Sequence, residues 1–213
     1  MYRYQDDSYN LVIKDFSSRN WLVKNTMGRL SIRQEYAAMS ALQGIEGITP
    51  ECYLLTDYTI AYRYFEGDTL KGYAKKGHQL QPSFLHKLEQ MIREIHARGW
   101  VHLDLRNMEN ILIDDHGNPA IIDFQSCMRW HKFPIWLQKF MRYADITGAY
   151  KAWTRYGATQ LPRHKQTFLT KYNATRKLWV FRGYPIHRMN LKLKAMAASI
   201  LSMDLVRSFM ELF

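Results

Sequence analysis

The sequence of 213 residues is poor in cysteine, with only Cys52 and Cys127. Two cysteines cannot form a disulfide framework, and their spacing matches no Cys-x-x-Cys zinc or redox motif. The remaining metal-binding candidates, the histidines, have no spacing typical of a metal site. We therefore expect a reducing compartment, and the cytoplasm is the default interpretation.

The sequence also lacks a long hydrophobic run. Its longest apolar stretch, residues 195–203, is too short to span a bilayer, and polar residues close to Met1 argue against a signal peptide. The chain is nevertheless 47% hydrophobic and 14% aromatic, which excludes a disordered tail. This length fits one domain, or two small lobes that share a cleft.

Acidic residues are scarce in the C-terminal part. Residues 127–213 contain 16 Lys and Arg but only 3 Asp and Glu, whereas residues 1–126 contain 14 and 16. The net charge of +11 therefore belongs almost entirely to the C-terminal part, and it favours an anionic partner such as nucleic acid, a lipid headgroup or a phosphorylated glycan. A solvated basic face is the alternative.

Basic residues alternate with large aromatic residues between Arg129 and Tyr143. This mixture suits a membrane interface, and it also suits stacking on unpaired bases. Since Trp136 and Phe140 are four residues apart on a predicted helix, we expect both to pack inside the protein. We expect Trp130 and the basic residues to face a partner.

Hydrophobic periodicity and turn residues predict an α+β fold with a small β-rich N-terminal part, containing one helix, and a larger, mostly helical C-terminal part. The first helix would begin at a cap on Ser31 and end near Gly44. The predicted strands are residues 9–16, entered through a hairpin, 53–55, 59–65, 111–113 and 120–124; the later helices are residues 82–98 and the region beyond 133, with interruptions near 157–162 and 183–185.

Two segments carry most of the chemistry, HLDLRNMENILI from His102 and IIDFQ from Ile121. Carboxylate and amide oxygens, as in Asp104, Asn110 and Asp123, are ligands that suit Mg²⁺. A free carboxylate beside such a metal can accept the proton of an attacking hydroxyl. An arginine such as Arg106 can offset charge on a transferred phosphoryl group.

These segments resemble the protein-kinase-like phosphotransferases. HLDLRNMEN is similar to the catalytic loop H-R-D-x-x-x-x-N, and Asp123-Phe124-Gln125 is similar to D-F-G. The resemblance implies that Asp104 is the catalytic base and that Asn110 and Asp123 hold Mg²⁺. Arg106 would lie where many protein kinases have a lysine that faces the transferred phosphate.

The resemblance continues upstream. LVIK, which ends at Lys14, is similar to the V-A-I-K strand whose lysine contacts the phosphates of ATP, and Glu35 is placed like its partner glutamate. Residues 64–67, with Glu66, would form the hinge that meets adenine. Asp145 and Gly148 suggest the buried aspartate that braces the catalytic loop. The fold implied is two-lobed, with an N-lobe over residues 1–66 and a C-lobe over residues 67–213.

The sequence departs from the kinase pattern at three places. Five residues, rather than four, separate Asp104 from Asn110, so that the loop is longer or Asn107 takes part. Gln125 replaces the glycine of D-F-G, which makes a flipping activation segment less favourable. No glycine precedes Lys14, so a glycine-rich phosphate lid is absent, and the turn at residues 6–8 is the only stand-in.

Within the superfamily, the sequence is most similar to RIO-type kinases and to Kdo/WaaP-type lipopolysaccharide kinases. The first interpretation is transfer from ATP to a sugar of the lipopolysaccharide core, with the basic C-lobe in peripheral contact with the inner membrane. Three alternatives stay open: a RIO-like Ser/Thr protein kinase, an inactive pseudokinase that acts as a nucleotide-sensing interaction module, and a nucleic-acid-binding protein.

Overall fold

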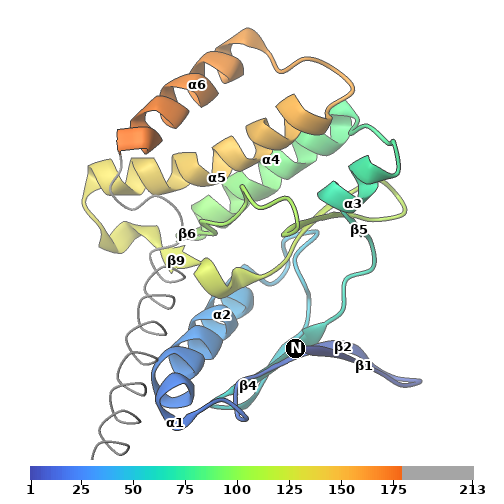
Figure 1. Cartoon of the computed structure of the whole chain (residues 1–213), viewed down its shortest axis with the longest axis vertical. Coiled ribbons are helices and arrows are strands. Elements are labelled where there is room, and N and C mark those ends of the chain that lie inside the picture. Colours follow the sequence, from blue (N-terminus) through green and yellow to red (C-terminus); the bar gives the residue numbers. More distant parts are fainter. Residues whose placement is uncertain (179–213) are drawn as a thin grey trace, which may run out of the picture. The chain divides into compact units, whose positions relative to one another are not determined.

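The structure is a computed structural model that describes residues 1–178 (Figure 1). The chain divides into two units after Leu169, and residues 170–178 carry the end of helix α6, Arg163–Leu178, into the second unit. The description below concerns the first unit. Among the described residues, no helix is both long and apolar enough to cross a membrane.

The N-terminal lobe is built on a four-stranded antiparallel sheet with the order β1-β2-β4-β3. The β1–β2 hairpin turns at residues 6–8, as predicted, because the Asp6 carboxylate accepts hydrogen bonds from the backbone of Ser8 and Tyr9 at 2.8 and 2.6 Å. The strands are β1 Tyr2–Gln5, β2 Asn10–Asp15, β3 Cys52–Thr56 and β4 Thr59–Arg63.

Helix α2, Arg29–Leu42, packs against this sheet and buries Ile32, Met39 and Leu42. The predicted cap at Ser31 is wrong. The chain is already helical from α1, Trp21–Val23, through a short π-helical stretch, Lys24–Gly28, and the side chain that caps the start is Asn20. Ser31 therefore lies inside the helix, with its hydroxyl available for another partner.

The C-terminal lobe is mostly helical, and this confirms the predicted two-lobed α+β fold. Helices α4, Pro82–Ala97, and α5, Ile135–Tyr156, lie side by side (Figure 1). Helix α4 buries the apolar face that the sequence predicts and ends before Gly99, whose φ of 83° suits glycine. Helix α3, Leu70–Lys75, is short. Strand β5, Asp68–Thr69, pairs with β7, Ile111–Ile113. Strand β6, Trp100–Val101, pairs with β9, Met128–Arg129.

The β7–β8 hairpin brings the two polar segments of the sequence together, because Asn110 directly precedes β7 and Asp123 follows β8. Strand β8, Pro119–Ile121, ends earlier than predicted, because Asp123 takes a left-handed backbone conformation and starts the 3₁₀ turn η2, Phe124–Ser126. A second turn, η3, covers Trp130–Lys132. One continuous apolar core joins the two lobes, and both cysteines are buried and free.

Candidate active site

A buried lysine joins the two lobes. Lys14 of β2 places its Nζ 2.6 Å from Glu35 Oε1 of α2 and 2.8 Å from Asp123 Oδ1 after β8. Lys14 is 8% exposed and Glu35 is 1% exposed. Burial by itself would lower the pKa of Lys14, but the carboxylates of Glu35 and Asp123 raise it above its ordinary value. The lysine is therefore a fixed cation, and the predicted Lys14–Glu35 ion pair is present.

The catalytic-loop candidates Asp104 and Asn110 lie in direct contact. The Asn110 amide donates to Asp104 Oδ2 at 2.7 Å, and Asn107 in turn donates to Asn110 Oδ1 at 3.3 Å. Burial raises the pKa of Asp104 to about 6; the Asn110 hydrogen bond opposes this rise, and the nearby charge of Asp123 adds to it. The extra residue of the loop is thus accommodated with both asparagines beside the carboxylate.

The backbone places Asp123 next to this pair. The Ile122 N–H donates to the Asn110 carbonyl at 3.0 Å, and the ring Nε2 of His102 lies 3.1 Å from the Ile122 carbonyl. Since the Asp104 N–H donates to His102 Nδ1, the Nε2–H tautomer satisfies both ring nitrogens of His102. Burial lowers the pKa of His102, which is a neutral structural bridge between the two loops.

Asp145 of α5 braces the catalytic loop, as the resemblance implies. Its carboxylate accepts hydrogen bonds from the backbone N–H groups of His102 and Leu103 at 2.8 and 2.7 Å, and it lies 3.0 Å from Nε2 of His96. A role for His96 was missed, because nothing in its local sequence indicates a partner 49 residues away. Gly148 permits the approach of α5, because a Cβ there would lie 2.7 Å from the Leu105 carbonyl oxygen.

Backbone strain within the described residues is confined to the same loops. Leu103 and Asp123 are the two described non-glycine residues with positive φ, 67° and 64°. A left-handed conformation costs such residues roughly 1–3 kcal/mol, and it persists only where the surroundings enforce it. The Asp145 brace holds Leu103, and the Lys14 ion pair holds Asp123. Strain of this kind is typical of functional sites.

Two predicted site residues, Arg106 and Glu66, also make contacts outside the Lys14 and Asp104 groups. Arg106 Nη1 donates to Thr147 Oγ1 of α5 at 2.9 Å, so its guanidinium packs against that helix. Glu66 is exposed and lies 3.3 Å from the Asn10 amide of β2, where the chain passes between the lobes. An open pocket of about 340 Å³ adjoins it; its lining includes Tyr64, Phe65 and the β7–β8 turn.

The turn at residues 6–8, at the position of the missing phosphate lid, makes its hydrogen bonds within the β1–β2 hairpin. Asp6 uses one carboxylate oxygen for the turn backbone and the other to accept from the Tyr4 hydroxyl at 2.7 Å. These bonds lower the pKa of Asp6, with the tyrosine as the largest cause. The two N–H groups that a lid would offer to a phosphate are therefore already bonded to Asp6.

The donor set fits a hard divalent cation that is shared with a substrate. Asn110 and Asp123 offer amide and carboxylate oxygens, and the Asp123 side chain is 41% exposed. No cluster of three or more Asp, Glu, His or Cys residues in the described part of the chain could hold a metal alone. Magnesium commonly takes one or two protein oxygens together with phosphate oxygens and water, which matches this arrangement.

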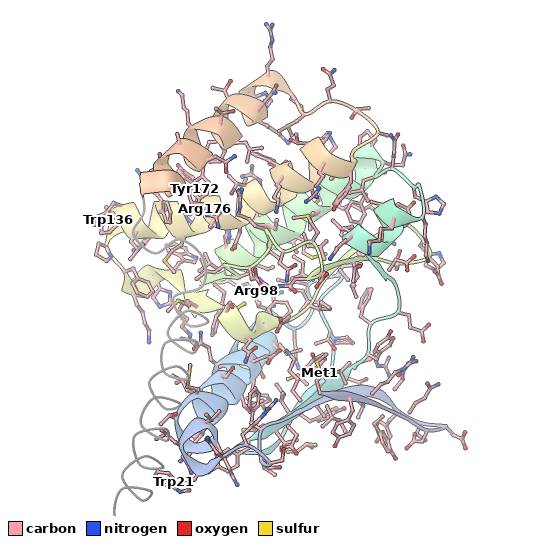
Figure 2. All side chains as sticks on the ribbon, in the orientation of Figure 1. Met1, Trp21, Arg98, Trp136, Tyr172 and Arg176 are labelled. Carbon is pink, nitrogen blue, oxygen red and sulfur yellow. The ribbon has the colours of Figure 1, made fainter. Side chains whose placement is uncertain are left out.

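The aromatic residues of the basic region differ from the prediction. Trp136, at the start of α5, is 58% exposed (Figure 2). Trp130, in contrast, is half-buried, donates from Nε1 to the His96 carbonyl at 2.9 Å and stacks under Arg142. We expected Trp136 to be buried and Trp130 to be exposed, and the opposite holds. Trp136 lies in the exposed first turn of α5, which begins at Ile135, whereas Trp130 contacts α4.

Comparison with known proteins agrees with this geometry. A family model described as the RIO domain matches residues 2–165, which include every candidate site residue above. None of the curated proteins matches the chain.

Proposed function

The chain belongs to the RIO domain family of atypical Ser/Thr kinases, and on this premise we propose that it transfers the γ-phosphate of ATP to a hydroxyl of a protein. Family membership makes the chain a kinase-type, ATP-dependent phosphotransferase that uses a divalent metal. The observation that carries the proposal is the contact of Lys14 with both Glu35 and Asp123, beside the Asp104–Asn110 pair.

In the proposed mechanism, residues 1–66 position the nucleotide, and the remainder of the chain provides the catalytic loop and the acceptor surface. Lys14, held by Glu35, contacts the phosphates of ATP, and the hinge near Glu66 meets adenine. A fixed, buried cation lowers the cost of placing anionic phosphates there, because it needs no reorganisation when they bind.

Asp104 receives the acceptor. Its carboxylate, oriented by the Asn110 amide, accepts the hydroxyl proton while the hydroxyl oxygen attacks the γ-phosphorus and ADP leaves. Asn110 and Asp123 would hold Mg²⁺, which neutralises charge on the phosphates when it is bound. Arg106 would offset the remaining charge of the transferred group if its side chain turns from Thr147 toward the acceptor.

The test is transfer of labelled γ-phosphate into a cell extract that has been separated into protein, glycolipid and RNA pools. We expect label on Ser or Thr of a protein with the full chain, and at least a 100-fold lower rate with Asp104→Asn. The matched control is Glu94→Gln, which neutralises an exposed carboxylate of helix α4 that does not line the pocket beside Glu66. Tight ATP binding without label in any pool would support a pseudokinase, and RNA binding that ignores ATP would support the nucleic-acid alternative.

One observation favours a second acceptor class at an anionic membrane surface. Within residues 127–169 the only acidic residue is the buried Asp145, and Ile135 and Trp136 are 63% and 58% exposed between Lys132 and Lys139. Exposed apolar side chains among cations suit anionic headgroups. This surface keeps a glycolipid such as the lipopolysaccharide core as the second candidate, although RIO membership favours a protein.

Vesicle binding separates the two acceptor classes. A membrane role predicts cosedimentation with phosphatidylglycerol vesicles but not with phosphatidylcholine vesicles, and a large loss with Trp136→Ser. Trp21→Ser is the matched control, because Trp21 is 76% exposed at α1, away from this surface (Figure 2). Equal losses with both variants, or no binding by the wild type, would leave the protein acceptor.

A further inference from the structure

Two side-chain hydrogen bonds join helix α2 to the loop that follows Asp123. The Gln125 amide donates to the Ser31 hydroxyl, and the Gln34 amide donates to the Cys127 carbonyl. Ser31 and Gln34 flank one turn of α2, next to Glu35, whereas Gln125 and Cys127 lie in and just after η2. We call Ser31, Gln34, Gln125 and the Cys127 carbonyl the clamp.

The clamp connects the two carboxylates that share Lys14. Glu35 is carried by α2 and Asp123 by the loop, so the distance between them depends on how α2 sits against that loop. At the far end of α2, Arg98 Nη1 donates to the carbonyls of Ala41 and Gln43 at 3.3 and 2.5 Å. A helix that is tied near its start and at its end cannot swing independently of the C-terminal lobe.

The loop itself is held along its length. After the clamp, β9 pairs with β6 through Met128 and Arg129, and Phe124 is 1% exposed in the core. At position 125, the glycine of the kinase pattern would free the backbone, whereas glutamine restricts it and adds a bond to α2. The restricted backbone at Gln125 and its hydrogen bond to Ser31 thus oppose the movement that an activation segment of the kinase type makes.

We propose that Gln125, Ser31 and Gln34 are positioning residues that hold α2 and the Asp123 loop as one body. The arrangement of Lys14, Glu35 and Asp123 is then assembled before ATP binds, and no modification of the loop is needed to form it. This proposal rests on the proposed function for its kinetic consequence, but its structural consequence is independent of activity.

The kinetic test uses Ser31→Ala, Gln125→Ala and the double variant of the full chain, with the protein pool as acceptor. We expect each single variant to lower kcat about tenfold, with less than a threefold change in the KM for ATP. Because both substitutions remove the same Gln125–Ser31 hydrogen bond, kcat of the double variant should be little lower than kcat of either single variant. Ser31→Thr keeps the hydroxyl and should restore kcat. Gln90→Ala is the matched control, because within residues 1–178 the side chain of Gln90 donates only to Glu94 of the same helix.

Amide hydrogen exchange of residues 29–42, without nucleotide, tests the clamp separately. We expect Gln125→Ala to speed exchange in α2 by at least tenfold although the substitution lies in another segment, and Gln90→Ala to leave it unchanged. Unchanged exchange in α2, or a loss of kcat in the double variant equal to the product of the two single losses, would overturn the proposal. If the wild type labels no acceptor, the proposed function fails. Amide hydrogen exchange of residues 29–42 then still tests whether the clamp holds α2 against the loop.

Discussion

Removal of the Lys14 ammonium should destabilise the protein chiefly through Glu35. In Lys14→Met, both carboxylates lose their cation, but their surroundings differ. Glu35 is 1% exposed and its Oε2 has no hydrogen-bond partner among the described residues, whereas the Asp123 side chain is 41% exposed and can be solvated. An uncompensated buried charge of this kind costs about 3–5 kcal/mol of unfolding free energy.

Neutralising Glu35 should therefore rescue the lysine variant. We expect Lys14→Met/Glu35→Gln to be at least about 2 kcal/mol more stable than Lys14→Met, because the buried charge is gone in the double variant. Lys14→Met/Asp123→Asn is the matched control, and it should recover less than about 1 kcal/mol, since water already screens that carboxylate.

Urea unfolding followed by circular dichroism at pH 7, without nucleotide, measures these differences. The comparison is valid where the variants share one m-value. A Lys14→Met variant that is isolated only unfolded, next to a folded Glu35→Gln double variant, would also agree with the reasoning. Equal recovery by the two double variants would refute it, as would a loss below about 1 kcal/mol in Lys14→Met.

Three further predictions concern the brace of the catalytic loop. Gly148→Ala should lower the unfolding free energy, measured in urea, by about 1–3 kcal/mol and should lower kcat, because its Cβ would lie 2.7 Å from the Leu105 carbonyl oxygen. The control is Gly72→Ala, also within a helix. Its Cβ would lie 3.1 Å from the Thr69 side chain, so we expect a smaller loss. Asp145→Asn should lower the unfolding free energy by about 2–4 kcal/mol, because each carboxylate oxygen accepts one backbone N–H and one of the two is replaced by a donor. A loss under about 0.5 kcal/mol would contradict the brace. Because folding lowers the pKa of His102, the unfolded chain binds a proton on this ring at higher pH than the folded protein does. The unfolding free energy should therefore fall as the pH drops below about 6.5, by up to about 1.4 kcal/mol per pH unit. Thermal melts of His102→Gln should lack this part of the pH dependence.

The fold could be predicted largely from local pattern. Helix α4 follows from the spacing of its apolar residues and from Gly99, and the β1–β2 and β7–β8 turns follow from Asp and Gly at the points of reversal. The start of α2 could not be predicted from Ser31, because a π-helical stretch continues the helix from α1. That continuation depends on packing rather than on a local stop signal.

The candidate site was predicted in part. The spacing of polar residues in two short segments identified Asp104, Asn110 and Asp123, and an apolar strand that ends in lysine identified Lys14. The partners His96 and Gln125 escaped prediction, because each bonds a residue far away in sequence: His96 and Asp145 are 49 positions apart, and Gln125 and Ser31 are 94. No local pattern encodes such a pairing.

Charge shows the same division between sequence and structure. The excess of Lys and Arg after residue 127 follows from composition alone. The structure decides which of these cations are used within the protein. Lys165 lies against Glu89 and the rings of Tyr150 and Trp153, and Arg142 covers Trp130, so neither is free for a partner.

The sequence by itself determined the kinase-like chemistry, because the residue types that transfer a phosphate must follow one another at short spacings on two loops. Only the tertiary structure decided the geometry of the site. Lys14, Glu35 and Asp123 come from three segments spread over 109 positions, and their contact exists only because the sheet, α2 and the β7–β8 hairpin share one core. Burial in that core makes the lysine a fixed cation, and burial is a property of the packed chain rather than of any segment.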